Sequence, residues 1–480
     1  MHLLQRALSR RVRAMAPRPL LLTPEAVAAH GIHIGKNEAA FRENSATIVM
    51  PSKAAAFLNP VQEFNRDLST LAIITWSNRL NDEKYQRYVD RKRPRGPPEA
   101  KRARTEESEY MPYQFTALEA LAATGLRSIR YAKEIPLLRS IIANDLAHGA
   151  VQAMQRNLAL NFPPGRPLDE LADLEDEQRN GAAADAPDAG SAEAAAVPQI
   201  HPDCKVRVNR GNAISLMYNH MEVAERFDLV DLDPYGTAAP FLDAAVQSVA
   251  DGGLLCVTCT DLAVLAGHNY PEKCWSLYGG VSIKAEYSHE AALRLVLHAI
   301  ASAAGRYGRY VQPMLSLSID FYLRVFVRVW TRPETVKLNA SQTGLVYTCS
   351  RCSDLHVQRM GRASEIENEK TGKMNVKCGS ASGPPTDRSC AQCGGSFHVG
   401  GPMWLGPLHD PDFCDEMISN LDKHTFGTAA RIRGMVSTAR DVREKLTQEL
   451  ESLFYFHPAK IAGLFHCASP ALVPVVYVIC

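Results

Sequence analysis

Alternating strand and helix patterns between residues 114 and 260 constrain the fold of this chain more than any other feature. Short apolar runs that fit buried strands are separated by helical segments, as where Val151, Met154 and Leu158 recur at helical spacing. The predicted strands are Gln114–Glu119, Ser140–Asp145, Lys205–Asn209, Phe227–Asp233 and Gly252–Thr260. Strands joined through helices form a parallel sheet, so the sequence predicts an α/β fold.

Three of these strands end in an acid, namely Glu119, Asp145 and Asp233. Ligands of open parallel sheets bind beyond the carboxyl ends of the strands, so the three acids mark the expected binding site. Asp145 is placed to accept hydrogen bonds from the ribose hydroxyls of a cofactor, as acids do at this position in dinucleotide-binding folds.

The tetrapeptide Asp233-Pro234-Tyr235-Gly236 fits the chemistry of methyl transfer to an exocyclic amine. The lone pair of such a nitrogen is delocalised into the ring, and a carboxylate that accepts its N–H improves the nucleophile and takes the proton. We expect Asp233 to fill this role, Pro234 to add no competing N–H donor, and Tyr235 to stack on the base. The same residues are common in plain turns, and Asp231 is an alternative carboxylate one step deeper in the sheet.

Two Cys-x-x-Cys pairs with 37 residues between them predict a metal site. Each pair can converge on one ion, and together they complete a tetrahedral sulfur site, so we expect structural zinc bound by Cys349, Cys352, Cys390 and Cys393. Disulfides are the alternative, which the lack of a secretory signal disfavours. Cys378 lies between the pairs and could replace one ligand.

Four segments carry a resemblance to a known family: Phe57–Asp67, Leu118–Arg130, Asp231–Gly236 and Cys256–Ala263. With their surroundings they cover most of residues 40–330, and they resemble the tRNA (guanine-N2)-dimethyltransferases, which modify guanine 26 of tRNA. The zinc cysteines of that family match the four cysteines above. The resemblance implies a Rossmann-like, S-adenosylmethionine-dependent methyltransferase fold with a smaller α+β, zinc-containing C-terminal domain. It also implies dimethylation of the N2 amine of guanine 26.

The resemblance implies that Arg66, Arg127 and Asp145 bind S-adenosylmethionine and that Asp233 is catalytic. An arginine is the natural bidentate partner for the methionine carboxylate.

Two further sets of site residues come with departures from the family. Asn212 and Ala213 stand where the family has an Asp-Ala pair that contacts adenine, and Asn212 lacks the charge, so a weaker cofactor affinity is expected. Phe57 and Asn59 are implied to bind substrate, but Leu58 between them replaces a tyrosine.

The basic start of the chain predicts an N-terminal extension over 1–40. The resemblance implies a methyltransferase domain over 41–330 and a zinc-containing domain over 331–480, which we expect to be incomplete. Disordered insertions are expected at about 81–110 and 163–199. The second of them is rich in alanine and acids and has too little apolar surface to order itself.

Basic segments suggest a location and a partner. The first 24 residues hold five arginines and no acid, which is typical of a mitochondrial transit peptide, and the basic run over 91–104 is typical of a nuclear localisation signal. A disordered tail and a solvated loop are the alternatives. We therefore expect a nuclear or mitochondrial location, or both.

We expect tRNA as the partner, no membrane span and a monomer. The net charge of +1 hides the nine acids and two arginines of residues 162–199, without which it would be +8. That surplus is compatible with nucleic acid. The last ten residues, Ala471–Cys480, contain no basic residue where the family has a further basic segment. We therefore expect a weaker affinity for tRNA.

Two alternative functions stay open. The first is an amine methyltransferase of the same fold that acts on DNA or on protein. The second is a weakened or inactive zinc-containing protein that binds tRNA.

Overall fold

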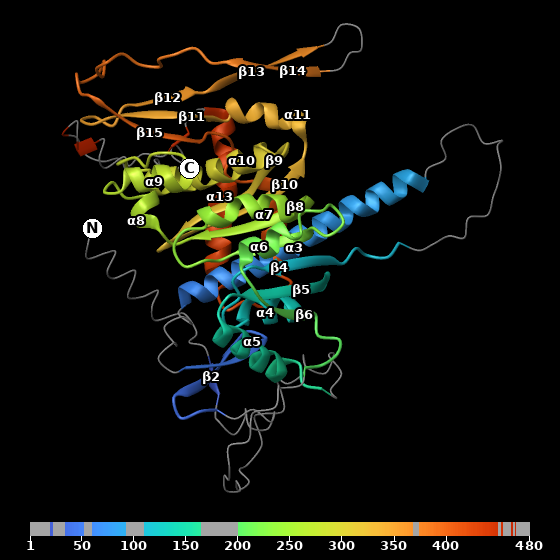
Figure 1. Ribbon diagram of the computed structural model, residues 1–480. Helices are drawn as coiled ribbons and strands as arrows, with labels where there is room; N and C mark the ends of the chain where they lie inside the picture. The colour runs from blue at the N-terminus through green and yellow to red at the C-terminus, as the bar shows by residue number, and fades with distance from the viewer. Residues whose placement is uncertain are drawn as a thin grey trace, which may run out of the picture. The chain divides into compact units, whose positions relative to one another are not determined.

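The computed structural model, drawn in Figure 1, describes residues 20–22, 34–51, 60–92, 110–164, 200–367, 374–449, 453–454, 462–463 and 466. The chain divides into two compact units. Unit 1 comprises Met1–Ala213 with His424–Ala429, and unit 2 comprises Ile214–Lys423 with Ala430–Cys480. Phe57, Asn59 and the acidic segment from residue 165 to 199 lie outside the described residues.

Unit 1 contains three parallel strands in the order β6-β5-β4, with bounds β4 (Phe115–Glu119), β5 (Leu138–Asp145) and β6 (Val206–Arg210). Helix α4 (Leu126–Glu134) joins β4 to β5, and α5 (His148–Asn161) follows β5. Val151, Met154 and Leu158 are buried on α5, as their spacing predicts.

A second, antiparallel sheet in unit 1 consists of β1 (Leu20–Leu22), β2 (Glu38–Glu43) and β3 (Ala46–Pro51). Ala40 and Val49 of this sheet pack with Ala159 and Leu160 of α5 in a small apolar cluster. Strand β2 of this sheet ends at Glu43, a buried carboxylate that belongs to the ion-pair network of the candidate active site.

Helix α3 (Pro60–Lys92) runs for 33 residues and corrects one sequence prediction. The insertion expected at about 81–110 is wrong for residues 81–92, which are helical. Aromatic contacts explain the extension: the Tyr110 ring lies 5.1 Å from Tyr85 and 5.4 Å from Tyr88, and its hydroxyl lies 2.9 Å from Asn81 Oδ1. The polar helix end is therefore held by a residue far along the chain.

Unit 2 contains four strands in the order β7-β8-β10-β9. Strands β7 (Phe227–Leu232) and β8 (Val249–Cys259) are parallel, whereas β10 (Tyr322–Thr331) is antiparallel to both β8 and β9 (Arg309–Ile319). The helical segments of this part of unit 2 are α6 (Ala213–Tyr218), η4 (Ala239–Phe241), α7 (Leu242–Ser248), α8 (Leu262–Leu265), α9 (Pro271–Tyr278) and α10 (Ser288–Gly305). Helix α6 begins on the last residue of unit 1.

The remainder of unit 2 carries the cysteine pairs. Its elements are α11 (Pro333–Val336), η5 (Lys337–Ala340), β11 (Thr343–Cys349), β12 (Leu355–Arg359), β13 (Gly361–Glu367), β14 (Met374–Ser380), β15 (Phe397–Trp404), α12 (Pro411–Leu421) and α13 (Ala429–Glu449). The order in the three-stranded sheet is β12-β11-β15, and β13 and β14 form a separate two-stranded ribbon (Figure 1). Helix α10 packs against both β9 and β15, so this part belongs to the same compact unit.

The predicted α/β class is confirmed, since each of the five predicted strands appears within a few residues of its expected bounds as β4, β5, β6, β7 and β8. The acids Glu119 and Asp145 are the last residues of β4 and β5, and Asp233 directly follows β7. The domain bounds at residues 40 and 330 stay predictions. Among the described residues, no helix is both long and apolar enough to cross a bilayer.

Candidate active site

The turn after β7 carries the three residues predicted to be catalytic. All six residues of β7 are buried, and the chain then turns outward: Asp233 is half-buried, Pro234 is buried, and the Tyr235 side chain is 82% exposed. Gly236 has φ of +83°, a left-handed conformation that favours glycine. The turn thus presents an aromatic ring to solvent next to a carboxylate at a strand end.

The alternative carboxylate, Asp231, is held inside the protein. Both of its oxygens accept hydrogen bonds from Arg324 of β10, at 2.9 and 3.0 Å, and the two side chains are fully buried. Arg324 also donates to Thr258 at 2.9 Å. Asp231 therefore ties β7 to β10 through β8, and this structural role favours Asp233 as the carboxylate that meets substrate.

Arg66, predicted to bind the cofactor, lies on α3 and is buried. Its Nε donates to Glu43 Oε1 at 2.6 Å, and its Nη2 donates to Glu43 Oε2. Burial alone would raise the pKa of Glu43, but Arg66 and Arg130 outweigh it and hold that pKa below its usual value. The guanidinium is thus fixed in a bidentate ion pair, a contact that the sequence did not predict.

Arg130 extends this ion pair into a buried network. Its guanidinium donates to Glu43 at 2.9 Å, to Asp67 at 2.6 Å and to Glu134 at 3.0 Å. Asp67 in turn accepts the backbone N–H of Thr428 at 3.0 Å and its hydroxyl at 2.7 Å. The network fixes α3, α4 and the β2 end in one arrangement within unit 1.

Arg127, the second predicted cofactor arginine, is buried on α4. Its Nη1 donates to Ser69 Oγ at 3.1 Å, and its Nε lies 3.8 Å from a Glu119 oxygen. The other Glu119 oxygen accepts from Ser128. Glu119, one of the three strand-end acids, thus orients the first turn of α4.

Asp145 occupies the end of β5 as predicted. Its two carboxylate oxygens accept backbone N–H groups of Ala123 at 3.0 Å and Ala147 at 2.9 Å. Each oxygen has a second lone pair that can still accept a ribose hydroxyl. The small-residue turn after β4, which includes Ala123 at φ +46° and Gly125 at φ +77°, lies beside it.

The remaining predicted cofactor residues differ in access. Asn212 is exposed directly before α6, whereas Ala213 is buried as its first residue. Unit 1 therefore holds Arg66, Arg127, Asp145, Asn212 and Ala213, and unit 2 holds Asp233, Pro234 and Tyr235.

The four predicted zinc ligands are brought together. The Sγ atoms of Cys349, Cys352, Cys390 and Cys393 all lie within 4.8 Å of one another. The Sγ atoms of Cys349 and Cys393 are 3.4 Å apart, and those of Cys352 and Cys390 are 3.6 Å apart. Both distances are close to the spacing of about 3.8 Å for thiolates around one tetrahedral zinc ion. These four side chains could hold a metal ion. Cys378, the alternative ligand, is exposed on β14 and is not part of the group.

Local backbone explains why the pairs converge. β11 ends on Cys349, which pairs with Phe397 at the start of β15, so the two knuckles meet at one end of that sheet. Gly394 closes the second knuckle at φ +69°, and its N–H donates to the Cys390 carbonyl at 2.8 Å. The long gap between the pairs contains β12 and the β13–β14 ribbon.

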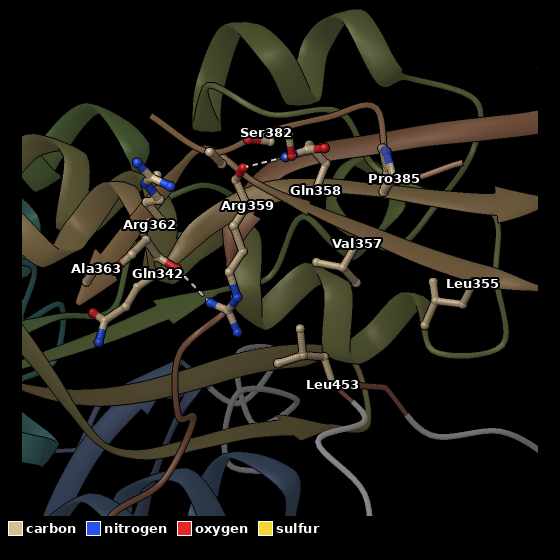
Figure 2. Close-up of a pocket in the computed structure, with 13 residues that line it drawn as sticks. Gln342, Leu355, Val357, Gln358, Arg359, Arg362, Ala363, Ser382, Pro385 and Leu453 are labelled. Carbon is tan, nitrogen blue, oxygen red and sulfur yellow. Dashed lines mark hydrogen bonds between the residues drawn. The ribbon is translucent and has the colours of Figure 1, made fainter. Parts of the chain in front are cut away.

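A cavity of about 820 Å³ lies elsewhere in unit 2, at the base of that ribbon (Figure 2). It is lined among others by Arg359, Arg362, Gln342 and Gln358, and Arg359 donates to the Ser341 carbonyl at 2.6 Å. It contains none of the residues predicted for catalysis, cofactor or metal, so it gives no support to the site assignment.

Comparison with known proteins decides the family. The chain matches the family described as N2,N2-dimethylguanosine tRNA methyltransferase over residues 36–177 and 192–479. This chain belongs to that family.

Individual members of the family show how far the match extends. The chain is 40% identical to the mitochondrial tRNA (guanine(26)-N(2))-dimethyltransferase of Saccharomyces cerevisiae, over 91% of this chain and 72% of that protein. It is 38% identical to the tRNA (guanine(26)-N(2))-dimethyltransferase of Homo sapiens, over 91% of this chain but 62% of that protein.

A solved structure supports the fold. Trm1 from Pyrococcus horikoshii, determined with S-adenosyl-L-methionine, matches with a TM-score of 0.56 and 23% sequence identity, over 88% of this chain and 86% of that one. The predicted Rossmann-like methyltransferase fold is thereby confirmed.

Proposed function

We propose that this protein transfers methyl groups from S-adenosylmethionine to the N2 amine of guanine 26 in tRNA, dimethylating it. The observation that carries the proposal is the turn after β7, where a half-buried Asp233 and an 82% exposed Tyr235 stand at a strand end of a methyltransferase fold. The relatives named above, which match most of this chain, are tRNA (guanine(26)-N(2))-dimethyltransferases.

The acceptor side of the reaction is assigned to the turn. Asp233 accepts the N–H of the guanine amine, raises the electron density on that nitrogen and takes the proton as the new N–C bond forms. Tyr235 stacks on the base and holds the nitrogen in line with the methyl group. When the N–C bond forms, the methyl–sulfur bond breaks and its electron pair stays on sulfur.

The donor side is assigned to unit 1. S-adenosylmethionine supplies a methyl group made electrophilic by its sulfonium. Asp145 suits the ribose hydroxyls, because its carboxylate is fixed by two backbone N–H groups and retains acceptor capacity. Arg66 and Arg127 suit the methionine carboxylate. Asn212, exposed before α6, suits the adenine amine through its amide oxygen. Phe57 and Asn59 remain proposed substrate contacts.

Zinc is proposed as a structural ion at the four cysteines. All four ligands come from the protein, so the ion would have no open position for catalysis. We further propose a monomer located in mitochondria, in the nucleus or in both. The arginine-rich first 24 residues and the name of the yeast relative support the mitochondrial part, and import of a reporter fused to residues 1–40 tests it.

Nucleoside mass spectrometry tests the reaction. Unmodified tRNA, DNA and protein are offered to the purified full chain with labelled S-adenosylmethionine. We expect dimethylguanosine with the wild type and a loss of about 100-fold or more with Asp233→Asn, since general-base removal has that size. Glu225→Gln, an exposed acid of the same unit, is the matched control and should keep full activity. Label in DNA or protein but not in tRNA would refute the proposal, as would binding of tRNA without transfer.

A further inference from the structure

We propose that Tyr278 and Asp261 are positioning residues, which hold the turn of Asp233 and Tyr235 in its reactive arrangement through Thr237. The inference rests on the proposed function, because it names the groups that orient that turn. All the residues involved lie in unit 2.

A directional chain of hydrogen bonds leads away from the turn. The Tyr278 hydroxyl lies 2.9 Å from both oxygens of Asp261 and 2.7 Å from Thr237 Oγ1. An ionised carboxylate only accepts, so the tyrosine proton points to Asp261 and the tyrosine oxygen accepts from Thr237. Thr237 Oγ1 in turn accepts the N–H of Ala239 at 3.1 Å. The hydroxyl of Thr237 is thereby fixed on both sides.

Asp261 makes this contact in place of the local one that its position favours. It directly precedes helix α8, where an aspartate commonly caps the first backbone N–H groups, yet its side chain makes no such cap. Both oxygens accept from Tyr278 instead. Its carboxylate is thus oriented toward a hydroxyl 17 residues away and not toward the start of α8.

Burial makes this series of hydrogen bonds rigid. Tyr278 is 1% exposed at the end of α9, and burial raises its pKa, so its hydroxyl keeps its proton. Burial also raises the pKa of Asp261, which the hydrogen bond from Tyr278 partly offsets. Buried polar groups that are fully hydrogen-bonded specify one arrangement, because each lost bond leaves a partner unsatisfied.

Two consecutive residues that follow β8, Thr260 and Asp261, hold two consecutive residues of the turn. Thr260 holds Gly236 through two hydrogen bonds of 2.8 Å, one from the Gly236 N–H to its hydroxyl and one from its own N–H to the Gly236 carbonyl. Asp261 holds Thr237 through Tyr278. The turn is therefore fixed at two adjacent residues, Gly236 and Thr237. These residues directly follow Asp233 and Tyr235, which are assigned to proton acceptance and base stacking.

Single and paired variants test the proposal by steady-state kinetics. Tyr278→Phe and Thr237→Val should each lower kcat by about 10-fold to 100-fold, because small misplacement of a reacting group has that effect. The KM values for tRNA and for S-adenosylmethionine should stay within about twofold, since the variants touch neither ligand. The double variant should be no worse than either single one, because both break one chain. Tyr270→Phe, at the other end of α9, is the control and should match the wild type.

The outcomes separate this proposal from the function on which it rests. Wild-type kcat in Tyr278→Phe, or a loss confined to KM, overturns the positioning role and leaves the proposed function standing. Wild-type protein without methyl transfer overturns the proposed function. The positioning role is then read without activity, from the ¹⁹F resonance of fluorotyrosine placed at residue 235. Tyr278→Phe should shift or sharpen that resonance and Tyr270→Phe should not, and an unchanged resonance overturns the proposal.

Discussion

The two arginines assigned to the methyl donor and the turn assigned to the acceptor are held in different ways. In unit 1, Arg66 and Arg127 are buried and engaged with acids and hydroxyls of the protein, and Arg130 at 0% exposure binds three carboxylates. In unit 2, the turn with Asp233 leaves Tyr235 82% exposed and is fixed mainly by hydroxyl and backbone hydrogen bonds.

The difference fits the ligand proposed for each region. Preformed ion pairs suit a small charged cofactor, because the arginines are oriented before it arrives and little side-chain entropy remains to be lost. An exposed ring on a short, firmly held turn suits a large polynucleotide, because the base must reach it from outside. Ion pairs orient the arginines of the first region, whereas hydrogen bonds to hydroxyl and backbone groups hold the C-terminal side of the turn in the second.

Removal of zinc should have the largest effect, and it should be confined to unit 2. Structural zinc supplies about 10 kcal/mol or more of folding free energy in small sites. Chelation of the full chain should raise amide hydrogen exchange in β11 and β15 by about 100-fold or more, while β4 and β5 of unit 1 keep their protection. Cys378→Ser should leave exchange unchanged. Equal loss of protection in both units would show that they do not differ in this way.

Breaking the buried network comes next. Arg130→Met leaves Asp67 buried without its ion-pair partner and leaves Glu43 with Arg66 alone, so we expect a loss of about 3–5 kcal/mol in the free energy of unfolding. Arg156→Met removes the more exposed pair with Glu38 in the same unit and should cost under about 1 kcal/mol. Denaturant titration of both variants measures the contrast. Similar losses would mean that burial does not set the strength of these ion pairs.

The exposed ring of Tyr235 should act on substrate and not on stability. Tyr235→Ala should lower kcat/KM for tRNA by about 5-fold to 150-fold, the kinetic equivalent of one stacked base, whereas Tyr235→Phe should retain most of it. Thermal unfolding of both variants should match the wild type. A drop in melting temperature without a kinetic change would assign the ring to folding.

The smallest effect concerns Glu63, beside the network in unit 1. Burial, together with the nearby carboxylates of Asp67 and Glu43, raises its pKa from 4.5 to about 7. The folded state therefore binds a proton that the unfolded state has lost between these pH values, and the stability contribution falls as pH rises through this window. Glu63→Gln should reduce this pH-dependent loss of unfolding free energy by on the order of 1 kcal/mol. Melting curves of both proteins at pH 5 and pH 8 measure it, and parallel curves would contradict the assignment.

Local patterns were enough to predict part of this molecule. The strand ends at Glu119, Asp145 and Asp233 follow from hydrophobic runs, and the cysteine group follows from ligand spacing, because both depend on short stretches of chain. The family resemblance added Arg66 and Arg127, which spacing alone would have left as surface arginines.

The contacts that orient those residues were not predictable in this way. Glu43 meets Arg130 across 87 positions, Asp231 meets Arg324 across 93, and Tyr278 meets Thr237 across 41. Nothing in the neighbouring residues encodes such partners, since they depend on how distant elements pack. The extension of α3 was missed for the same reason, because Tyr110 stabilises it from outside the helix.

The β13–β14 ribbon has a consequence for engineering. It pairs only with itself among the described strands, and it lies inside the long gap between two knuckles that meet at one end of a neighbouring sheet. Since the four cysteines bring the ends of this loop together, a longer ribbon adds little closure entropy, about 0.6 kcal/mol for each doubling in length. The ribbon is therefore a suitable place to graft a peptide tag or an RNA-binding module, because it carries none of the residues assigned to methyl transfer.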